Sequence, residues 1–262
     1  MKIKRYRLRK KYRILLKKYA KLFFVVLLLL GVFHLGKVMY RNFFDKDENQ
    51  EIAKIQEETK NDTPEKEKEP TIDVIIDAGH GGIDGGAISC TGVPESQINL
   101  QIALKLEDLM HLLGLHTVMI RDTDRSVYTD GTTIAAKKVS DIKERLRIVN
   151  TTPNALFVSI HQNNFQDAKY YGAQVFYNAQ PGSQPLAEAI QTAFREILCA
   201  GNKRQIKKAS DVYLMDHINC TGVLIECGFL SNYREESLLR NEAYQQKICC
   251  IIATTVSQYL NT

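Results

Sequence analysis

The chain has 262 residues, of which 44% are hydrophobic and 25% charged, as in ordinary globular proteins. This composition excludes a wholly disordered chain, a collagen and a membrane protein with many spans. The formal net charge of +5 arises at one end, because the first 21 residues hold 11 of the 35 basic residues and no acidic one. Beyond them, 24 basic residues stand against 30 acidic ones. We therefore expect no nucleic-acid binding by the folded part, which would need positive charge on a folded face.

An apolar run follows the basic tip of residues 1–21. It covers residues 22–36 (LFFVVLLLLGVFHLG) and extends to Tyr40 if the Lys37 ammonium reaches the head groups. Residues 22–40 therefore predict one helix in the cytoplasmic membrane. Basic residues precede this run and acidic residues follow it, so the positive-inside rule puts the tip in the cytoplasm and the remainder outside. A cleaved signal peptide is the alternative, but no small-residue cleavage site follows, and we favour an uncleaved signal-anchor.

Residues 41–70 are predicted to form a disordered, charged linker. Of the 26 residues from Asp45 to Pro70, 15 are charged, and very few could be buried in a core. Such a linker would tether the following domain, residues 71–262, close to the outer surface of the membrane.

Residues 71–262 alternate between strand and helix patterns. The predicted strands cover residues 72–77, 115–121, 155–159, 173–177, 212–215 and 223–226, and the predicted helices cover residues 95–113, 140–150, 185–198 and 242–260. The first helix carries an apolar stripe and ends at Gly114; the stripe is formed by Ile98, Ile102, Leu106, Leu109, Met110 and Leu113. This alternation predicts an α/β fold with a mostly parallel, layered sheet and helices on both faces.

Polar side chains gather where the predicted strands end. His80 follows the first strand in a glycine-rich loop, and His161 follows the strand at 155–159. Glu226 ends the strand at 223–226, and Glu95 opens the first helix. Because ligands in such sheets bind outside the carboxyl ends of the strands, we expect these four side chains to converge. Two imidazoles and two carboxylates can hold a zinc ion, leave one position for water and supply a base for its proton.

Two other interpretations of these residues stay open at this point. A single histidine after a strand is often only a hydrogen-bonded structural residue, and Glu95 alone fits a carboxylate that is favoured at a helix N-terminus. The loop at residues 79–86 could also bind phosphate. However, a G-x-G-x-x-G motif that starts at Gly79 would require glycine where Asp84 stands, and no Gly-Lys-Ser/Thr follows.

Four ordered segments resemble the signature blocks of one enzyme family. They are VIIDAGHGGIDGGA at 74–87, Glu95, SIHQN at 159–163 and VLIECGFLSN at 223–232. They are similar to those of zinc-dependent N-acetylmuramoyl-L-alanine amidases of the AmiC/LytC type, over essentially all of residues 71–262. The anchor and single domain also resemble the germination-specific spore-cortex amidases.

The resemblance implies a role for each site residue. His80, Glu95 and His161 match the zinc ligands, and Glu226 matches the catalytic glutamate. The implied substrate is the amide that joins the lactyl group of N-acetylmuramic acid to L-alanine in peptidoglycan, hydrolysed by zinc-activated water. An activating protein partner stays unidentified. The sequence departs from the family pattern at Ala78, Gln162, Asn164 and the segment Cys220-Thr221-Gly222. These departures remove none of the implied zinc ligands, but the details of the substrate groove do not follow from the resemblance.

Two competing functions accompany this hypothesis. Cys227 lies beside Glu226 and allows a Cys-His wall peptidase, although such an enzyme has no need for the two glutamates. The second competing function is a wall-binding domain that keeps the fold without activity, but the complete set of four residues argues against it.

Because the six cysteines follow no zinc-finger or disulfide-scaffold spacing, we predict mostly free thiols.

Several further residues carry weaker predictions. Asp77 could orient a ligand imidazole or hold the backbone of the loop, and Asn163 could donate a hydrogen bond near the metal or cap a loop. Arg121 and Asp124 are interpreted as loop structure. Four aromatic residues could line a glycan groove, although packing on a strand face is expected more often for them; they are Tyr170, Tyr171, Phe176 and Tyr177.

Overall fold

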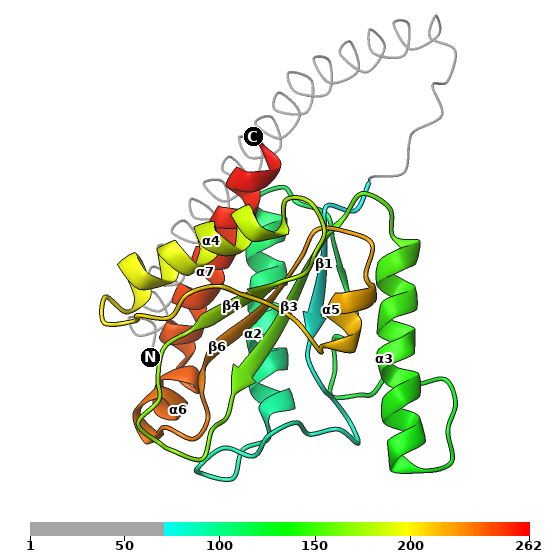
Figure 1. Cartoon of the computed structure of the whole chain (residues 1–262), viewed down its shortest axis with the longest axis horizontal. Helices are drawn as coiled ribbons and strands as arrows, with labels where there is room; N and C mark the ends of the chain where they lie inside the picture. Colours follow the sequence, from blue (N-terminus) through cyan, green and yellow to red (C-terminus); the bar gives the residue numbers. More distant parts are fainter. Residues whose placement is uncertain (1–70) are drawn as a thin grey trace, which may run out of the picture. The chain divides into compact units, whose positions relative to one another are not determined.

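The computed structural model of the chain describes residues 71–262 (Figure 1). The basic tip, the predicted membrane helix and the predicted linker all lie outside the described residues. Within residues 71–262, no helix has the length and apolar character needed to cross a membrane.

A six-stranded sheet forms the centre of the fold. Its strands are β1 (Val74–Ala78), β2 (Thr117–Met119), β3 (Leu156–Asn163), β4 (Gln174–Tyr177), β5 (Lys207–Lys208) and β6 (Gly222–Phe229), in the order β2-β1-β3-β6-β4-β5. All neighbouring strands pair in parallel except β4 and β6, which are antiparallel. The structure therefore confirms the predicted α/β fold with a mostly parallel sheet.

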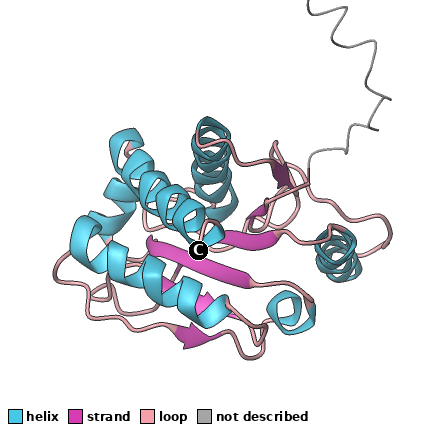
Figure 2. Ribbon diagram, turned by 90° about the horizontal axis from the view of Figure 1, so that it is seen from above, coloured by secondary structure: helices cyan, strands magenta, loops and turns pink. Residues whose placement is uncertain are grey.

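Helices cover both faces of this sheet (Figures 1 and 2). The helices are α2 (Glu95–Leu112), α3 (Ile134–Thr151), α4 (Ser183–Ala193), α5 (Tyr213–His217), α6 (Tyr233–Leu239) and α7 (Glu242–Leu260), and a π-helical turn, Phe194–Leu198, continues α4. Helices α2, α4 and α7 pack on one face, whereas α3 and α5 lie over the other. The sheet is thus the middle of three layers.

The alternation of side chains along β1 explains why both faces are covered. Val74, Ile76 and Ala78 are buried in the larger core under α2 and α7, and Ile75 is buried in the smaller core on the opposite face. Because successive side chains in a strand point to opposite faces, a strand that is apolar at every position needs a layer on each side.

The predicted stripe of α2 is only partly confirmed. Ile98, Ile102, Leu106 and Met110 are fully buried, but the side chain of Leu113 is 44% exposed. Leu113 follows the helix, and Gly114 ends it in a left-handed conformation with φ +78°, as the sequence predicted.

The prediction of a strand at residues 212–215 was wrong, because Tyr213–His217 form helix α5. Leu214, Met215 and Ile218 are all buried in the smaller core, a spacing that suits a helical turn and not an alternating strand. A short apolar run does not distinguish the two structures, and here tertiary packing selects the helix.

The boundaries of other elements also differ from the predictions. Helix α3 begins at Ile134 and not at residue 140, because the Thr133 side chain accepts a hydrogen bond from Ala136 N and caps the helix. The short edge strand β5 and helix α6 were not predicted. The Asn232 side chain caps α6 by accepting hydrogen bonds from the backbone of Arg234 and Glu235.

Strands β3 and β6 both run further than the sequence predicted. His161 lies within β3 and not after it, and Glu226 lies in the middle of β6. The two strands pair up to a bulge between His161 and Asn163, so their extra residues keep backbone hydrogen bonds. This extension places both side chains on a rigid part of the sheet.

Candidate metal and catalytic site

The four predicted site residues come from four segments that meet at the carboxyl ends of the strands (Figure 1). His80 lies in the loop after β1, Glu95 is the first residue of α2, and His161 and Glu226 lie on adjacent strands. His161 and Glu226 are partners in the strand register, so their side chains project from the same face of the sheet. The structure therefore brings all four residues together.

Three of these residues form a compact donor group. One ligand atom from each of His80, Glu95 and His161 lies within 4.8 Å of the other two. The Glu95 carboxylate lies between the imidazoles, with Oε2 at 3.3 Å from His80 Nε2 and Oε1 at 3.0 Å from His161 Nδ1. The His80 and His161 rings meet edge to face, with centroids 5.0 Å apart.

The Glu95 carboxylate is held by backbone as well as side-chain donors. Ala87 N donates to Oε2 at 3.0 Å, and Gln162 N donates to Oε1 at 3.1 Å. Asn99 Nδ2 adds a bond to Oε1 at 3.2 Å. Burial alone would raise the pKa of Glu95, but hydrogen bonds with His161 and His80 outweigh it and hold the pKa well below its usual range. Glu95 is therefore an ionised carboxylate in a fixed orientation.

The His80 imidazole also has a fixed orientation. His80 Nδ1 lies 2.9 Å from Asp84 Oδ2, and Lys138 Nζ lies 2.6 Å from the other oxygen of Asp84. This contact leaves His80 Nε2 facing Glu95. Burial opposes the His80 imidazolium, but hydrogen bonds with Glu95 and Asp84 prevail and raise the pKa of His80 to about 9. A site that attracts a proton this strongly also suits a cation.

This donor set fits zinc. Two imidazole nitrogens and one carboxylate oxygen are the protein ligands of many hydrolytic zinc sites, which keep a fourth position open. Asp84 beside His80 is the kind of carboxylate that orients a ligand histidine. Residues 71–262 contain no other group of three or more His, Cys, Asp or Glu side chains arranged to hold a metal ion.

Glu226 differs from Glu95 in its surroundings. Its Oε2 atom is buried and, among the described residues, has no hydrogen-bond partner. Burial raises the pKa of Glu226 to about 7, despite the opposing charge of His161. A carboxylate with a pKa near neutrality and a free oxygen can accept a proton and release it again, as a general base must.

Two glycines make room for the donor group. A Cβ atom at Gly79 would lie 2.2 Å from the His161 ring, and a Cβ atom at Gly86 would lie 2.7 Å from Glu95 Oε2. Gly86 also has a φ of +69°, which disfavours any side chain. The glycine-rich loop thus serves close packing around the imidazoles, and the phosphate-binding alternative has no support in the geometry.

Two buried arginines hold the loop that carries His80. Arg121 donates to Ala78 O at 2.7 Å and to Gly79 O at 3.0 Å. Arg145, from α3, donates to His80 O at 2.7 Å and forms an ion pair with Asp77. The interpretation of Arg121 as loop structure is therefore confirmed. Asp77 holds the backbone through Arg145, and within residues 71–262 its side chain makes hydrogen bonds to Arg145 and Ser159 but not to an imidazole.

Arg145 was not identified from the sequence. It lies 68 residues from Asp77 in the sequence. It belongs to helix α3, in which Val149 is the one other buried residue. The only local signal is Asp141, four residues earlier, whose Oδ2 lies 2.6 Å from Arg145 Nε.

We expect Arg145→Met to destabilise the fold strongly. The change leaves Asp77 buried without its partner and removes two bonds to the loop carbonyls, so unfolding free energy should fall by about 3–5 kcal/mol. Arg147→Met is the matched control on the same helix, because Arg147 pairs with Glu144 at the surface and should change stability by at most about 0.5 kcal/mol. Urea denaturation of the three proteins measures both effects. Equal stabilities would contradict the structural role of Arg145.

Comparison with known proteins decides the family. The profile of the N-acetylmuramoyl-L-alanine amidase family matches residues 74–258, which include all four site residues. The chain belongs to this family. It is 32% identical over 188 residues to the germination-specific N-acetylmuramoyl-L-alanine amidase of Bacillus subtilis, covering 71% of this chain and 78% of that protein. N-acetylmuramoyl-L-alanine amidase LytC of Bacillus subtilis is 28% identical over 190 residues, covering 71% and 35%.

Solved amidases have the same fold. The CwlD amidase of Clostridioides difficile, solved in complex with the GerS lipoprotein, aligns with a TM-score of 0.70 and 39% identity, covering 73% of this chain and 99% of that one. An N-acetylmuramoyl-L-alanine amidase from Clostridium difficile 630 aligns with a TM-score of 0.64 and 28% identity, covering 73% and 98%. The chain is thus an amidase-family hydrolase with a peptidoglycan substrate.

The cysteines of this amidase do not support a thiol mechanism. All six are free, as predicted, and Cys227 is buried in the core under α7, on the face of β6 opposite to Glu226. Burial raises the pKa of the Cys227 thiol well above its usual value, so a nucleophilic thiolate is disfavoured. Cys227 is therefore a core residue of the amidase.

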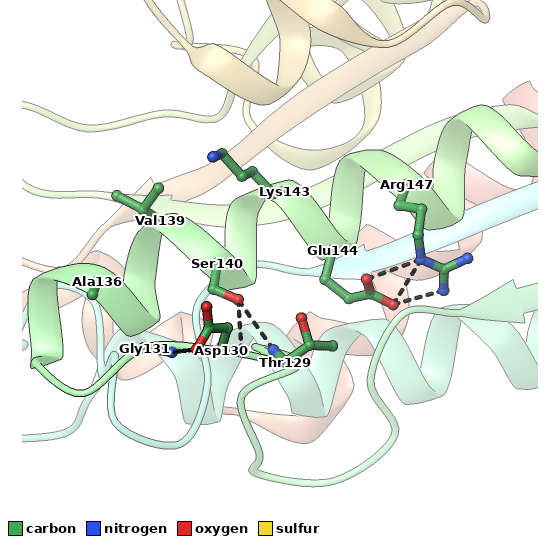
Figure 3. A pocket seen from close by; sticks show the side chains of 9 residues that line it. All are labelled: Thr129, Asp130, Gly131, Ala136, Val139, Ser140, Lys143, Glu144 and Arg147. Atoms are coloured by element: carbon green, nitrogen blue, oxygen red, sulfur yellow. Dashed lines mark hydrogen bonds and ion pairs between the residues drawn. The ribbon is translucent and has the colours of Figure 1, made fainter.

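Two hollows of the amidase surface are lined by residues singled out from the sequence, and a third is not. A cavity of about 260 Å³ beside α3 and α5 is lined by His80 and His161, and another of about 300 Å³ lies beside β4 and is lined by Asn163. The third lies along α3 and the loop before it, where Ser140 accepts hydrogen bonds from the backbone of Thr129 and Asp130 (Figure 3). It contains no predicted site residue.

Proposed function

We propose that this amidase cleaves the amide between the lactyl group of N-acetylmuramic acid and L-alanine with one zinc ion, held by His80, Glu95 and His161, and with Glu226 as the general base. One observation carries the proposal. Three suitable donor atoms converge within 4.8 Å, and a buried carboxylate with an unpartnered oxygen lies on the strand position that pairs with His161.

Each residue of the site has a separate role in the proposed hydrolysis. A bound zinc ion supplies a Lewis acid that lowers the pKa of water to about 7 and polarises a carbonyl. Glu226 accepts the proton of the attacking water on its free Oε2 and passes it to the departing alanine nitrogen. Asp84 keeps Nδ1 of His80 occupied, so that Nε2 is available as a ligand. Arg121 and Arg145 hold the loop that carries His80 by donating hydrogen bonds to the carbonyl oxygens of Gly79 and His80.

The proposal also covers the location and setting of the enzyme. We place the catalytic domain outside the cytoplasmic membrane, attached through an uncleaved anchor at residues 22–40. The germination-specific relative supports a spore-cortex substrate. The complex of CwlD with a lipoprotein supports a lipoprotein partner for this chain as well.

Mass analysis of digested peptidoglycan tests the reaction itself. The full chain, purified in detergent and loaded with zinc, should release peptides that begin with L-alanine and leave glycan strands with free lactyl carboxylates. Chelation of the metal should stop the release. A wall-binding domain without activity would release nothing, and a wall peptidase would cut inside the peptide and leave the lactyl amide intact.

A further inference from the structure

The cavity of about 300 Å³ beside β4 is lined by Gln174, which lies on the same face of the sheet as Glu226. Gln174 on β4 is the register partner of Glu226, just as Glu226 is the partner of His161. His161, Glu226 and Gln174 therefore form one row of side chains across three neighbouring strands. Gln174, Phe176, Arg204, Lys207 and Phe229 line this hollow, which we call the cationic pocket.

Arg204 is fixed in the cationic pocket with part of its guanidinium free. Its Nε donates to Tyr171 O at 2.9 Å, and one terminal nitrogen donates to Gln174 Oε1 at 3.1 Å. The guanidinium carbon lies 4.3 Å from the centre of the Phe229 ring. Gln174 is itself oriented, because its Nε2 donates to Gln205 O at 2.8 Å. The second terminal nitrogen of Arg204 has no hydrogen-bond partner among residues 71–262.

The positive charge of this pocket is not neutralised by a neighbouring carboxylate. None of the ion pairs within the described part of the chain involves Arg204 or Lys207. Glu235 is the acidic residue that acts on Arg204, but its Oε2 already accepts hydrogen bonds from the backbone of Gly172 and Phe229. A half-buried arginine, fixed on an aromatic ring and facing a hollow, is well suited to bind a carboxylate.

We propose that the cationic pocket binds a carboxylate of the stem peptide, on the residue that follows L-alanine. This proposal rests on the proposed function, which places the scissile amide at Glu226. The pocket begins one strand away from Glu226, so it can reach only groups close to that amide. Arg204 then binds the carboxylate, Lys207 adds a second positive charge, and the exposed aromatic rings of Phe165 and Tyr170 contact the peptide at the rim.

The chain offers a matched pair of lysines for the test. Lys207 pairs with Phe176 in the register and lines the cationic pocket. Lys208, the next residue of β5, pairs with Tyr177, whose side chain packs against the larger core on the opposite face of the sheet. Lys207→Gln and Lys208→Gln therefore remove the same charge from the same exposed strand, but only one of them changes the pocket.

The experiment compares two soluble glycan–peptide fragments that differ only after L-alanine, with a free carboxylate in one and the corresponding carboxamide in the other. The zinc-loaded full chain should have a higher kcat/KM for the carboxylate, by about tenfold. Arg204→Gln should remove this preference, Lys207→Gln should reduce it, and Lys208→Gln should leave it unchanged. Lys208→Gln, which lies outside the pocket, should also leave hydrolysis of the carboxamide within about twofold of wild type.

Binding of the free peptides separates this proposal from the proposed function. The affinity of an alanyl peptide with the carboxylate, compared with its carboxamide, is measured by titration without any need for hydrolysis. Discrimination that Lys207→Gln weakens would support the pocket even if neither fragment were cleaved, and the proposed function alone would then fail. Hydrolysis of both fragments at equal rates, with equal peptide affinities, would overturn the pocket and leave the amidase activity intact.

Discussion

Glu226→Gln is expected to stop hydrolysis while the protein still binds one zinc ion. The substitution keeps the size of the side chain and removes only its ability to accept a proton. General acid–base catalysis contributes about two to four orders of magnitude, so the rate of peptide release should fall by at least about 100-fold. Zinc content should stay at one ion per chain, because Glu226 lies outside the group of His80, Glu95 and His161. Elemental analysis and release of peptides from peptidoglycan measure the two properties.

The pH dependence of stability provides a control for this variant. In the metal-free protein the pKa of Glu226 is raised from 4.5 to about 7, mainly by burial. The folded state thus holds the proton more tightly than the unfolded state, so the wild-type protein loses stability as pH rises from about 4.5 to about 7. Glu226→Gln stays neutral and should unfold at higher urea than wild type at pH 8, with little difference at pH 4. Loss of zinc, or near wild-type rates, would contradict the assigned role.

His161→Ala is expected to lose zinc and activity together. Loss of a partner that only orients a ligand already lowers metal affinity by about 10–100-fold, and loss of a ligand should cost more. Two remaining donors, His80 and Glu95, cannot complete the set of three that such zinc sites use. The variant should therefore contain less than stoichiometric zinc after dialysis and release no peptides. His80→Ala should behave in the same way.

His217→Ala is the control for the histidine variants. His217 is exposed on α5, where its Nδ1 bonds to Tyr213 O and its ring stacks on Tyr213. Its removal should change neither zinc content nor the rate of hydrolysis. If His161→Ala and His80→Ala both retained one zinc ion per chain, the ligand assignment would be wrong.

The local pattern of the chain was sufficient to predict the convergence of the site residues, but not the buried arginines that hold the loop around His80. His80, His161 and Glu226 follow or end apolar segments that were predicted to be buried strands, and parallel strands bring their carboxyl ends to one edge. The convergence of these residues follows from that rule alone. Arg121 and Arg145 stand 42 and 65 or more residues from the loop atoms that they bind, and an arginine side chain normally indicates an exposed surface.

Amino-acid sequence by itself determined the α/β class, the order of most elements and the identity of the four converging side chains, because hydrophobic period and strand-end chemistry are local properties. Tertiary structure alone decided three other features. It made residues 213–217 a helix, because their apolar side chains fill a gap beside β6 and α3. It extended β3 and β6 until His161 and Glu226 paired. It also brought Arg204 onto Phe229 and Gln174, since contacts between distant segments depend on how the strands are ordered in the sheet.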